Sequence, residues 1–185
     1  MKIFINPGHD LEYDSGAVNN NYGITEAVIA KTIGDKVAYY LNNVGYTTQV
    51  MQSDNLNYDS DYADRPYPVC VAANDWNSDV FISIHCNAAN TQAKGTECLV
   101  YSLGGESEVL ANCIQNQIIN SLNTVDRGIK VRPELTVLKR THMPAVLVET
   151  AFIDNDEDAL LLMNHADDFA AAIARGITDY ASAVK

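Results

Sequence analysis

Short apolar runs alternate along the chain with longer stretches of helical periodicity, and this alternation predicts an α/β fold. The clearest run, Val80 to His85, is rich in β-branched residues and nearly continuous, as expected of a central strand covered on both faces. Five more strands are predicted, at residues 2–5, 47–51, 95–101, 135–139 and 145–149.

A long amphipathic helix is predicted between Ile24 and Val44. Apolar residues recur there every three or four positions, and Gly45 follows at the place of a helix-ending glycine. Three more helical segments are predicted, at residues 65–76, 107–122 and 156–184.

The ends of these helical segments carry weaker signals. Pro66 and Pro68 obscure the start of the first segment, because proline interrupts helical hydrogen bonding. Ser107 is the candidate N-cap of the second segment, and the third is expected to divide near Asn164. The polar stretch 52–64 is predicted to be a loop.

Composition limits the classes of function. The 185 residues suffice for one globular domain, residues 1–185, and the 47% hydrophobic content is typical of such a domain. Twelve Lys and Arg against 24 Asp and Glu give a formal charge of −12, which repels a phosphate backbone. We therefore expect no nucleic-acid partner. Membrane insertion is not expected either, because no stretch approaches membrane-spanning length.

The four cysteines, Cys70, Cys86, Cys98 and Cys113, lack the paired spacing of thiolate zinc sites and redox motifs. We expect them to be buried free thiols, with a structural disulfide as the alternative. The first apolar residues after Met1 are interrupted too early to form the core of a signal peptide. Export would therefore need another route.

Four side chains with metal-binding or acid-base capability fall near one edge of the predicted sheet. His9 follows the first strand and His85 ends the central strand, while Glu26 opens the long helix and Glu149 closes the last strand. In open α/β sheets the loops that leave the carboxyl ends of the strands gather at one edge. A shared site is therefore expected there.

Each of the four has a structural interpretation when taken alone. A single histidine at a strand end is more often a structural residue than a ligand, and the helix dipole alone favours Glu26. Glu149 ends an apolar run, where a desolvated carboxylate has a raised pKa unless the strand tip is exposed. Taken together, two imidazoles and one carboxylate are the ligand set of a catalytic zinc ion, and a second carboxylate then serves as general acid and base.

Ordered blocks of sequence cover nearly the whole chain. They are Asn-Pro-Gly-His-Asp at 6–10 with Asp-Ser-Gly-Ala at 14–17, Gly-Ile-Thr-Glu at 23–26, Phe-Ile-Ser-Ile-His-Cys-Asn-Ala at 81–88 and Pro-Ala-Val-Leu-Val-Glu-Thr-Ala-Phe-Ile-Asp-Asn at 144–155. Each block is moderately specific, but their order is hard to produce by chance. Together they resemble the zinc-dependent, type-3 family of N-acetylmuramoyl-L-alanine amidases.

The resemblance implies a three-layer α/β/α fold with a mostly parallel six-stranded sheet. It also implies a Zn2+ ion held by His9, Glu26 and His85, with Glu149 as the catalytic acid and base. The family hydrolyses the amide between N-acetylmuramic acid and the L-alanine that begins the stem peptide of peptidoglycan, with a metal-bound water as the nucleophile. It includes autolysins, sporulation and division enzymes and phage endolysins, so we expect the chain to act on the bacterial cell wall.

Two departures from the family pattern affect these expectations. Members often have Asp where this chain has Asn6, so the charge is missing here, although an amide can still form hydrogen bonds. Many members also carry a wall-binding module or a leader, and neither is recognisable here. We expect a monomer or a weak dimer that is exported by another route, is phage-associated, or is a trimmed catalytic fragment.

Several other residues are second-tier candidates. Asn87 either orients a ligand or forms a turn. Arg65 and Arg127 either pair with stem-peptide carboxylates or are solvated. His142 is expected near the mouth of the site and His165 at the surface. No organised sugar-stacking face is expected from the tyrosines that follow the second predicted strand, which are Tyr58, Tyr62 and Tyr67.

Two other functions stay open. A zinc peptidase or carboxypeptidase that cuts elsewhere in the stem peptide needs the same three ligands and a glutamate, although the ordered blocks fit the amidase family better. A non-enzymatic peptidoglycan-binding domain is the second alternative. The presence of all four functional residues argues against that alternative.

Overall fold

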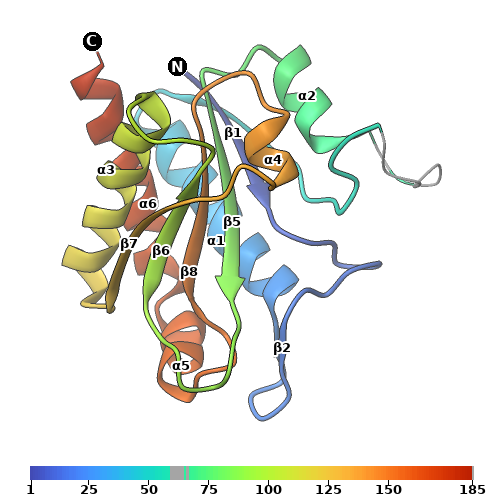
Figure 1. The fold of residues 1–185 in the computed structure, drawn as a ribbon, viewed down its shortest axis with the longest axis vertical. Helices are drawn as coiled ribbons and strands as arrows, with labels where there is room; N and C mark the ends of the chain where they lie inside the picture. The colour runs from blue at the N-terminus through green and yellow to red at the C-terminus, as the bar shows by residue number, and fades with distance from the viewer. Residues whose placement is uncertain (59–64, 66, 185) are drawn as a thin grey trace.

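A six-stranded sheet forms the middle layer of the protein (Figure 1). The computed structural model describes residues 1–58, 65 and 67–184. The strands are β1 (Lys2–Pro7), β4 (Thr47–Val50), β5 (Val80–Asn87), β6 (Thr96–Val100), β7 (Asp126–Val131) and β8 (Ala145–Phe152). Their order is β4-β1-β5-β8-β6-β7, and all neighbours are parallel except β6 and β8. A separate hairpin consists of β2 (Val18–Asn19) and β3 (Ile24–Thr25).

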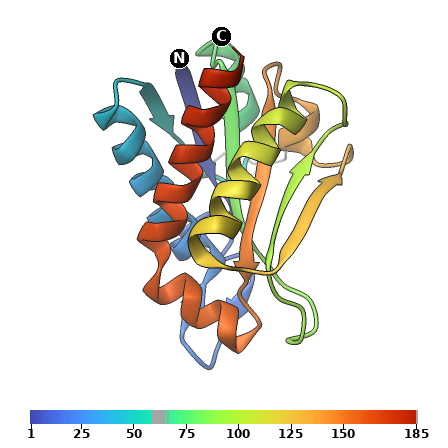
Figure 2. The same ribbon diagram turned by 90° about the vertical axis from the view of Figure 1, so that its left-hand side faces the viewer.

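Helices cover the two faces of this sheet unequally. One face is covered by three long helices, with α6 between the other two (Figure 2): α1 (Glu26–Asn43), α3 (Glu106–Leu122) and α6 (Ala166–Ala183). The other face is covered by two short helices, α2 (Val69–Asp75) and α4 (Thr136–Lys139). α5 (Asp156–Asn164) follows β8. The prediction of a mostly parallel six-stranded sheet between two helical layers is confirmed.

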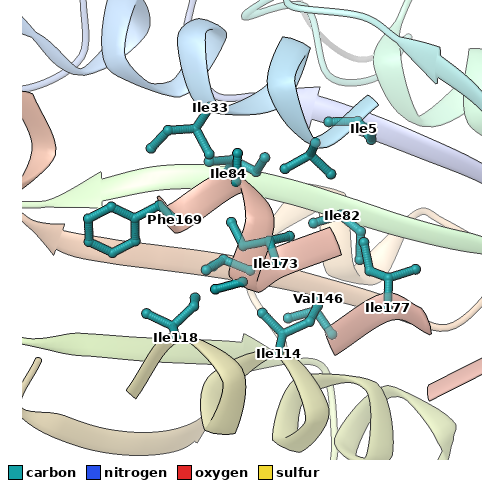
Figure 3. Close-up of a cluster of buried hydrophobic side chains, with 14 of the residues drawn as sticks. Ile5, Ile33, Ile82, Ile84, Ile114, Ile118, Val146, Phe169, Ile173 and Ile177 are labelled. Carbon is teal, nitrogen blue, oxygen red and sulfur yellow. The ribbon is translucent and has the colours of Figure 1, made fainter. Parts of the chain in front are cut away.

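Strand residues alternate between two hydrophobic cores, because successive side chains point to opposite faces of a sheet. The larger core lies under the three long helices, and Figure 3 labels Ile5, Ile33, Ile82, Ile84, Ile114, Ile118, Val146, Phe169, Ile173 and Ile177 in it. The smaller core, under α2 and α4, contains Phe81 and Leu147. By the same alternation, His85 and Glu149 belong to the thinly covered face.

The strand pattern differs from the prediction at two places. The segment predicted as a strand at 135–139 instead contains the helical turn α4 (Thr136–Lys139), and the amides of Leu138 and Lys139 both donate to the carbonyl of Leu135. The sixth strand is β7, which was not predicted. Charged residues and Gly128 interrupt its apolar pattern, and β7 lies at the edge of the sheet, where one side of the strand has no partner strand.

The helix ends match the predictions only in part. Gly45 has φ +86 after α1, and α5 separates from α6 at His165, as expected. The predicted helix at 65–76 begins only at Val69, because Pro68 is extended, with ψ 137. Ser107 is not a cap: it lies inside α3, and its hydroxyl accepts a hydrogen bond from the amide of Ala145. In the predicted loop 52–64, residues 59–64 lie outside the described residues.

All four cysteines are free thiols, as predicted. Cys70, Cys86 and Cys98 are buried, and Cys113 is partly exposed. Burial raises the pKa of the Cys86 and Cys98 thiols, which makes them unreactive as nucleophiles. Within the described residues, no helix has the length and apolar character needed to cross a membrane.

The two ends of the described chain lie close together. Met1 and Val184 line the same cavity, next to the amino ends of β1 and β5 (Figure 1). His9 and His85 lie at the carboxyl ends of these two strands. The termini and the candidate site are therefore at opposite ends of the sheet.

Candidate metal centre

Glu26 is the centre of a three-residue cluster at the carboxyl ends of β1 and β5. Its side chain is buried at the first turn of α1. Nε2 of His9 lies 3.0 Å from Oε2 of Glu26, and Nδ1 of His85 lies 2.9 Å from Oε1. One potential ligand atom from each residue lies within 4.8 Å of the others. The structure thus brings together the three residues that were predicted as metal ligands.

Two glycines allow these side chains to approach closely. The amide of Gly8 donates to the carbonyl of Ile84 over 2.8 Å, which places the end of β1 beside His85. A Cβ atom at Gly8 would lie 2.2 Å from Cε1 of His85. A Cβ atom at Gly16, which has φ +64, would lie 2.7 Å from Oε2 of Glu26. Any larger residue at either position would displace a predicted ligand.

Backbone amides hold the Glu26 carboxylate in place. The amide of Ala17 donates to Oε2 over 3.0 Å, and the amide of Cys86 donates to Oε1 over 3.0 Å. Burial opposes ionisation of Glu26, but the hydrogen bonds with His85 and His9 outweigh it and hold its pKa well below the usual value. The cluster therefore contains a fixed negative charge, to which a cation is attracted.

Asp14 completes the environment of His9, a role that was not predicted from the sequence. Its Oδ2 lies 2.7 Å from Nδ1 of His9, and the amide of Gly16 donates to its Oδ1 over 3.0 Å. Burial lowers the pKa of His9, but the hydrogen bonds with Glu26 and Asp14 outweigh this and raise it to about 9. A carboxylate on the far ring nitrogen is the usual device for orienting a metal-binding histidine. The sequence signal for this role was the position of Asp14, a carboxylate five residues after a candidate histidine ligand.

Glu149 lies beside the cluster, on the strand next to β5. It is paired in register with His85 on β5 and with Glu97 on β6. Its Oε2 is buried and has no hydrogen-bond partner among the described residues. Burial, opposed only in part by His85, raises the pKa of Glu149 to about 7, and the charges of Glu26 and Glu97 add to the shift. The expectation of a desolvated carboxylate at this position is confirmed.

Two cavities meet at the cluster. The larger, of about 420 Å³, is lined by His9, Glu26, His85 and Glu149 and extends along the sheet to Arg132. We call this larger cavity the cleft. The smaller, of about 170 Å³, shares the two histidines with the cleft and extends toward α4. A ligand bound at the cluster can therefore extend to either side.

Comparison with known proteins identifies the family. Residues 3–179 match the sequence model of the family described as N-acetylmuramoyl-L-alanine amidase. The chain belongs to this family. Among solved structures, the N-acetylmuramoyl-L-alanine amidase AmiC2 of Nostoc punctiforme superposes with a TM-score of 0.84 at 28% identity, over 98% of this chain and 97% of that one. The enzyme class predicted from the sequence blocks is thus confirmed.

Curated relatives of the amidase differ in length. The uncharacterized protein YqiI of Bacillus subtilis is 35% identical over 184 residues, which cover 96% of this chain and 84% of YqiI. The N-acetylmuramoyl-L-alanine amidase LytC of the same organism is 34% identical over 183 residues, which again cover 96% of this chain. The amidase chain described here spans only 35% of LytC.

Two second-tier candidates contact Glu97 in the amidase. The side-chain amide of Asn87 donates to Oε1 of Glu97 over 3.2 Å, and Nε of Arg127 lies 2.9 Å from Oε2. The guanidinium of Arg127 also lies 4.8 Å from the centre of the Phe152 ring. Arg127 therefore balances the charge of a buried carboxylate next to Glu149, and the Asn87 amide helps to fix its position.

The remaining candidates are not part of the cluster of His9, Glu26 and His85. Arg65 forms an ion pair with Asp54 over 2.9 Å. The placement of His142 near the mouth of the site was wrong: it is exposed, and its amide binds Asn74 of α2, beyond the amino end of β8. His165 is at the surface, as expected. Tyr58 and Tyr67 are exposed, and Tyr62 lies outside the described residues.

Asn6 forms the hydrogen bonds expected of an amide at this position. It is buried, its Nδ2 donates to the carbonyl of Met51 over 3.0 Å, and its Oδ1 accepts from Ser83 over 2.9 Å. An ionised aspartate could not donate to Met51. The departure from the family pattern is therefore accommodated by hydrogen bonds to β5 and to the residue after β4.

Proposed function

We propose that this amidase hydrolyses the bond between N-acetylmuramic acid and L-alanine in peptidoglycan with a Zn2+ ion held by His9, Glu26 and His85 and with Glu149 as general acid and base. The observation that carries the proposal is the convergence of three ligand atoms within 4.8 Å, with Glu149 on the adjacent strand. Membership of the N-acetylmuramoyl-L-alanine amidase family supports the choice of bond.

The residues present fit a catalytic zinc ion. Two imidazole nitrogens and one carboxylate are a ligand set of catalytic zinc, whereas structural sites use four protein ligands. Asp14 holds the His9 ring with Nε2 facing Glu26, and backbone amides fix Glu26 itself. When bound, the zinc ion supplies Lewis acidity toward the amide carbonyl and toward an attacking water.

Glu149 supplies proton transfer. It lines the cleft, and its pKa of about 7 means that both protonation states are populated at neutral pH. The Glu149 carboxylate takes a proton from the attacking water and delivers a proton to the leaving nitrogen of L-alanine. Glu97, the other carboxylate on this part of the sheet, is engaged by Asn87 and Arg127 and so does not compete for this role.

The proposal is tested by measuring zinc content together with the release of free amino groups from purified peptidoglycan. The variant Glu149→Gln keeps the shape of the side chain and loses its proton chemistry. Glu134→Gln is the matched control, because Glu134 is an exposed carboxylate that lines the same cleft. We expect one zinc ion per chain in all three proteins and new L-alanine amino termini from the parent and the control. Glu149→Gln should be slower by about 10²–10⁴-fold.

Each other outcome contradicts a stated part of the proposal. A parent protein that binds no zinc would refute the metal assignment. New amino groups on a different stem residue would support the peptidase alternative. Zinc and peptidoglycan binding without any released amino group would support the binding-domain alternative.

We also propose that residues 1–185 act as one monomeric catalytic domain on the cell wall. Membership of a cell-wall amidase family supports the location. Sedimentation at micromolar concentration tests the monomer, which should give a mass near 20.2 kDa. A doubled mass would contradict it.

A further inference from the structure

The side chain of Gln52 links the two elements that carry His9 and Glu26. Gln52 lies two residues after β4, the edge strand next to β1. Its Nε2 donates to the carbonyl of Gly8 over 3.0 Å and to the carbonyl of Ala27 over 2.9 Å. Gly8 immediately precedes His9, and Ala27 immediately follows Glu26. One side-chain amide therefore joins the end of β1 to the first turn of α1, beside both proposed ligands.

The backbone of His9 has an uncommon conformation that needs such support. Its φ is +64, in the left-handed region, where the Cβ atom of an L-residue lies too close to the following carbonyl oxygen. Conformations of this kind persist only where surrounding contacts hold them. The Gly8 carbonyl belongs to the same planar peptide as the amide of His9, so holding the carbonyl restrains the φ rotation. Gln52 thus restrains the torsion that sets the direction of the His9 side chain.

The other contacts of His9 hold its ring and the chain that follows it. Oδ2 of Asp14 lies 2.7 Å from Nδ1 of the ring, and Oε2 of Glu26 lies 3.0 Å from Nε2. The amide of Asp10 donates to the carbonyl of Asp14 over 2.8 Å. Gln52 holds the peptide before His9. The direction of the ring depends on both sets of contacts, because a side chain follows its backbone as well as its partners.

Gln52 acts on the backbone and does not face a ligand. Among the described residues, neither the cleft nor the smaller cavity at the cluster is lined by Gln52. Its two acceptors also fix the orientation of its amide group, because only the NH2 end can donate to a carbonyl oxygen. The reversed amide would bring Oε1 against two other oxygen atoms. Gln52 therefore holds the two backbone segments in one defined arrangement.

We propose that Gln52 is a positioning residue of the metal centre, which holds the Gly8–His9 peptide so that Nε2 of His9 faces Glu26. This inference rests on the proposed function, because it assigns His9 and Glu26 as zinc ligands. Loss of an outer partner of a metal ligand lowers metal affinity about 10- to 100-fold. Removal of the Gln52 amide should lower zinc affinity about tenfold, the lower end of this range, since Asp14 still holds the ring.

Gln115 of α3 provides a matched control. Its Nε2 also makes two hydrogen bonds, to the carbonyl of Thr96 and to Oδ1 of Asp126, both over 2.8 Å. In both glutamines Oε1 is buried and has no hydrogen-bond partner among the described residues. Thr96 and Asp126 begin β6 and β7, and neither adjoins a proposed ligand in the sequence. Loss of the Gln115 amide should therefore lower stability without affecting the metal.

The test compares Gln52→Met and Gln115→Met with the parent amidase. Methionine keeps a long unbranched side chain but cannot donate a hydrogen bond. Without metal, both variants should unfold at lower urea concentration than the parent, because each loses two hydrogen bonds. Only Gln52→Met should bind zinc about tenfold more weakly in competition with a chelator. It should also change the visible absorption of the Co2+-loaded protein, which depends on the ligand arrangement, and lower kcat with KM unchanged.

The outcomes separate this inference from the function on which it rests. A parent protein that binds no zinc would overturn the proposed function, and the role of Gln52 with it. If the parent binds zinc and Gln52→Met matches it in zinc affinity and cobalt absorption, only the role of Gln52 is overturned. An equal loss of zinc affinity in both variants would do the same, because weaker binding would then follow from lower stability. If Gln52→Met does not fold, Gln52→Asn makes the comparison, since its shorter side chain cannot reach both carbonyls.

Discussion

A methyl group at Gly8 should disable the proposed metal centre without unfolding the protein. Gly8 does not have a positive φ, so alanine is compatible with its backbone conformation. The difficulty is the His85 ring, since the new Cβ atom would lie 2.2 Å from Cε1 and 2.5 Å from both ring nitrogens. Ordinary contact begins at 3.4 Å, so the ring must move by the difference, 1.2 Å.

A movement of that size exceeds what a metal site tolerates. Metal–ligand distances deviate from their usual values by no more than about 0.2 Å. A misplacement of about 1 Å in an active site lowers the rate about a hundredfold. We therefore expect Gly8→Ala to lower both zinc affinity and kcat/KM at least about a hundredfold. The unfolding free energy of the metal-free protein should change by less than about 2 kcal/mol, because only one side chain at the surface of the cleft must shift.

Gly105→Ala is the matched control for this experiment. Gly105 has φ −126 at the start of α3, and an added Cβ atom would meet nothing within 4 Å. Zinc affinity is measured by competition with a chelator, activity by amino-group release, and stability by urea unfolding. The reasoning is refuted if Gly8→Ala binds zinc and cleaves peptidoglycan as Gly105→Ala does, because the close approach to the His85 ring would then not determine its position.

Three other predictions concern single side chains. Asp14→Asn should weaken zinc binding about tenfold, measured by chelator competition, because His9 loses the carboxylate that orients it. Metal-free Glu149→Gln should be more stable than the parent at pH 8 by roughly 3 kcal/mol but not at pH 4. Because burial raises the pKa of Glu149 to about 7 in the folded protein, its ionisation lowers the free energy of unfolding as the pH rises above the pKa of the unfolded chain. Urea unfolding of both proteins at both pH values checks the sign. Of the four cysteines, only Cys113 should react readily with a thiol reagent before unfolding.

The fold was predictable where burial is complete. Residues 80–85 and 145–149 lie in central strands whose two faces are both covered. Such strands need continuous apolar runs, and these runs made them recognisable in the sequence. β7 was missed because it lies at the sheet edge, where charged residues occur beside apolar ones. The apolar residues of 135–139 were read as a strand, but Val137 and Leu138 point into the smaller core from a single helical turn.

The candidate site was predictable from topology but not in its details. Strand ends at one edge of the sheet explain why His9, His85 and Glu149 were found together. The role of Asp14 depends on a turn that brings it within 2.7 Å of His9, and no periodicity in the sequence reports such a turn. His142 was misplaced because it precedes the amino end of β8, whereas Glu149 lies toward the carboxyl end of that strand.

The position of the termini has a practical consequence for engineering. Met1 and Val184 lie side by side, so a short linker could join them into a circular chain with little distortion. A fused domain or a surface anchor attached at either end would sit away from the proposed metal ligands. An immobilised enzyme of this kind would present its catalytic side outward, toward an insoluble polymer that cannot diffuse to it.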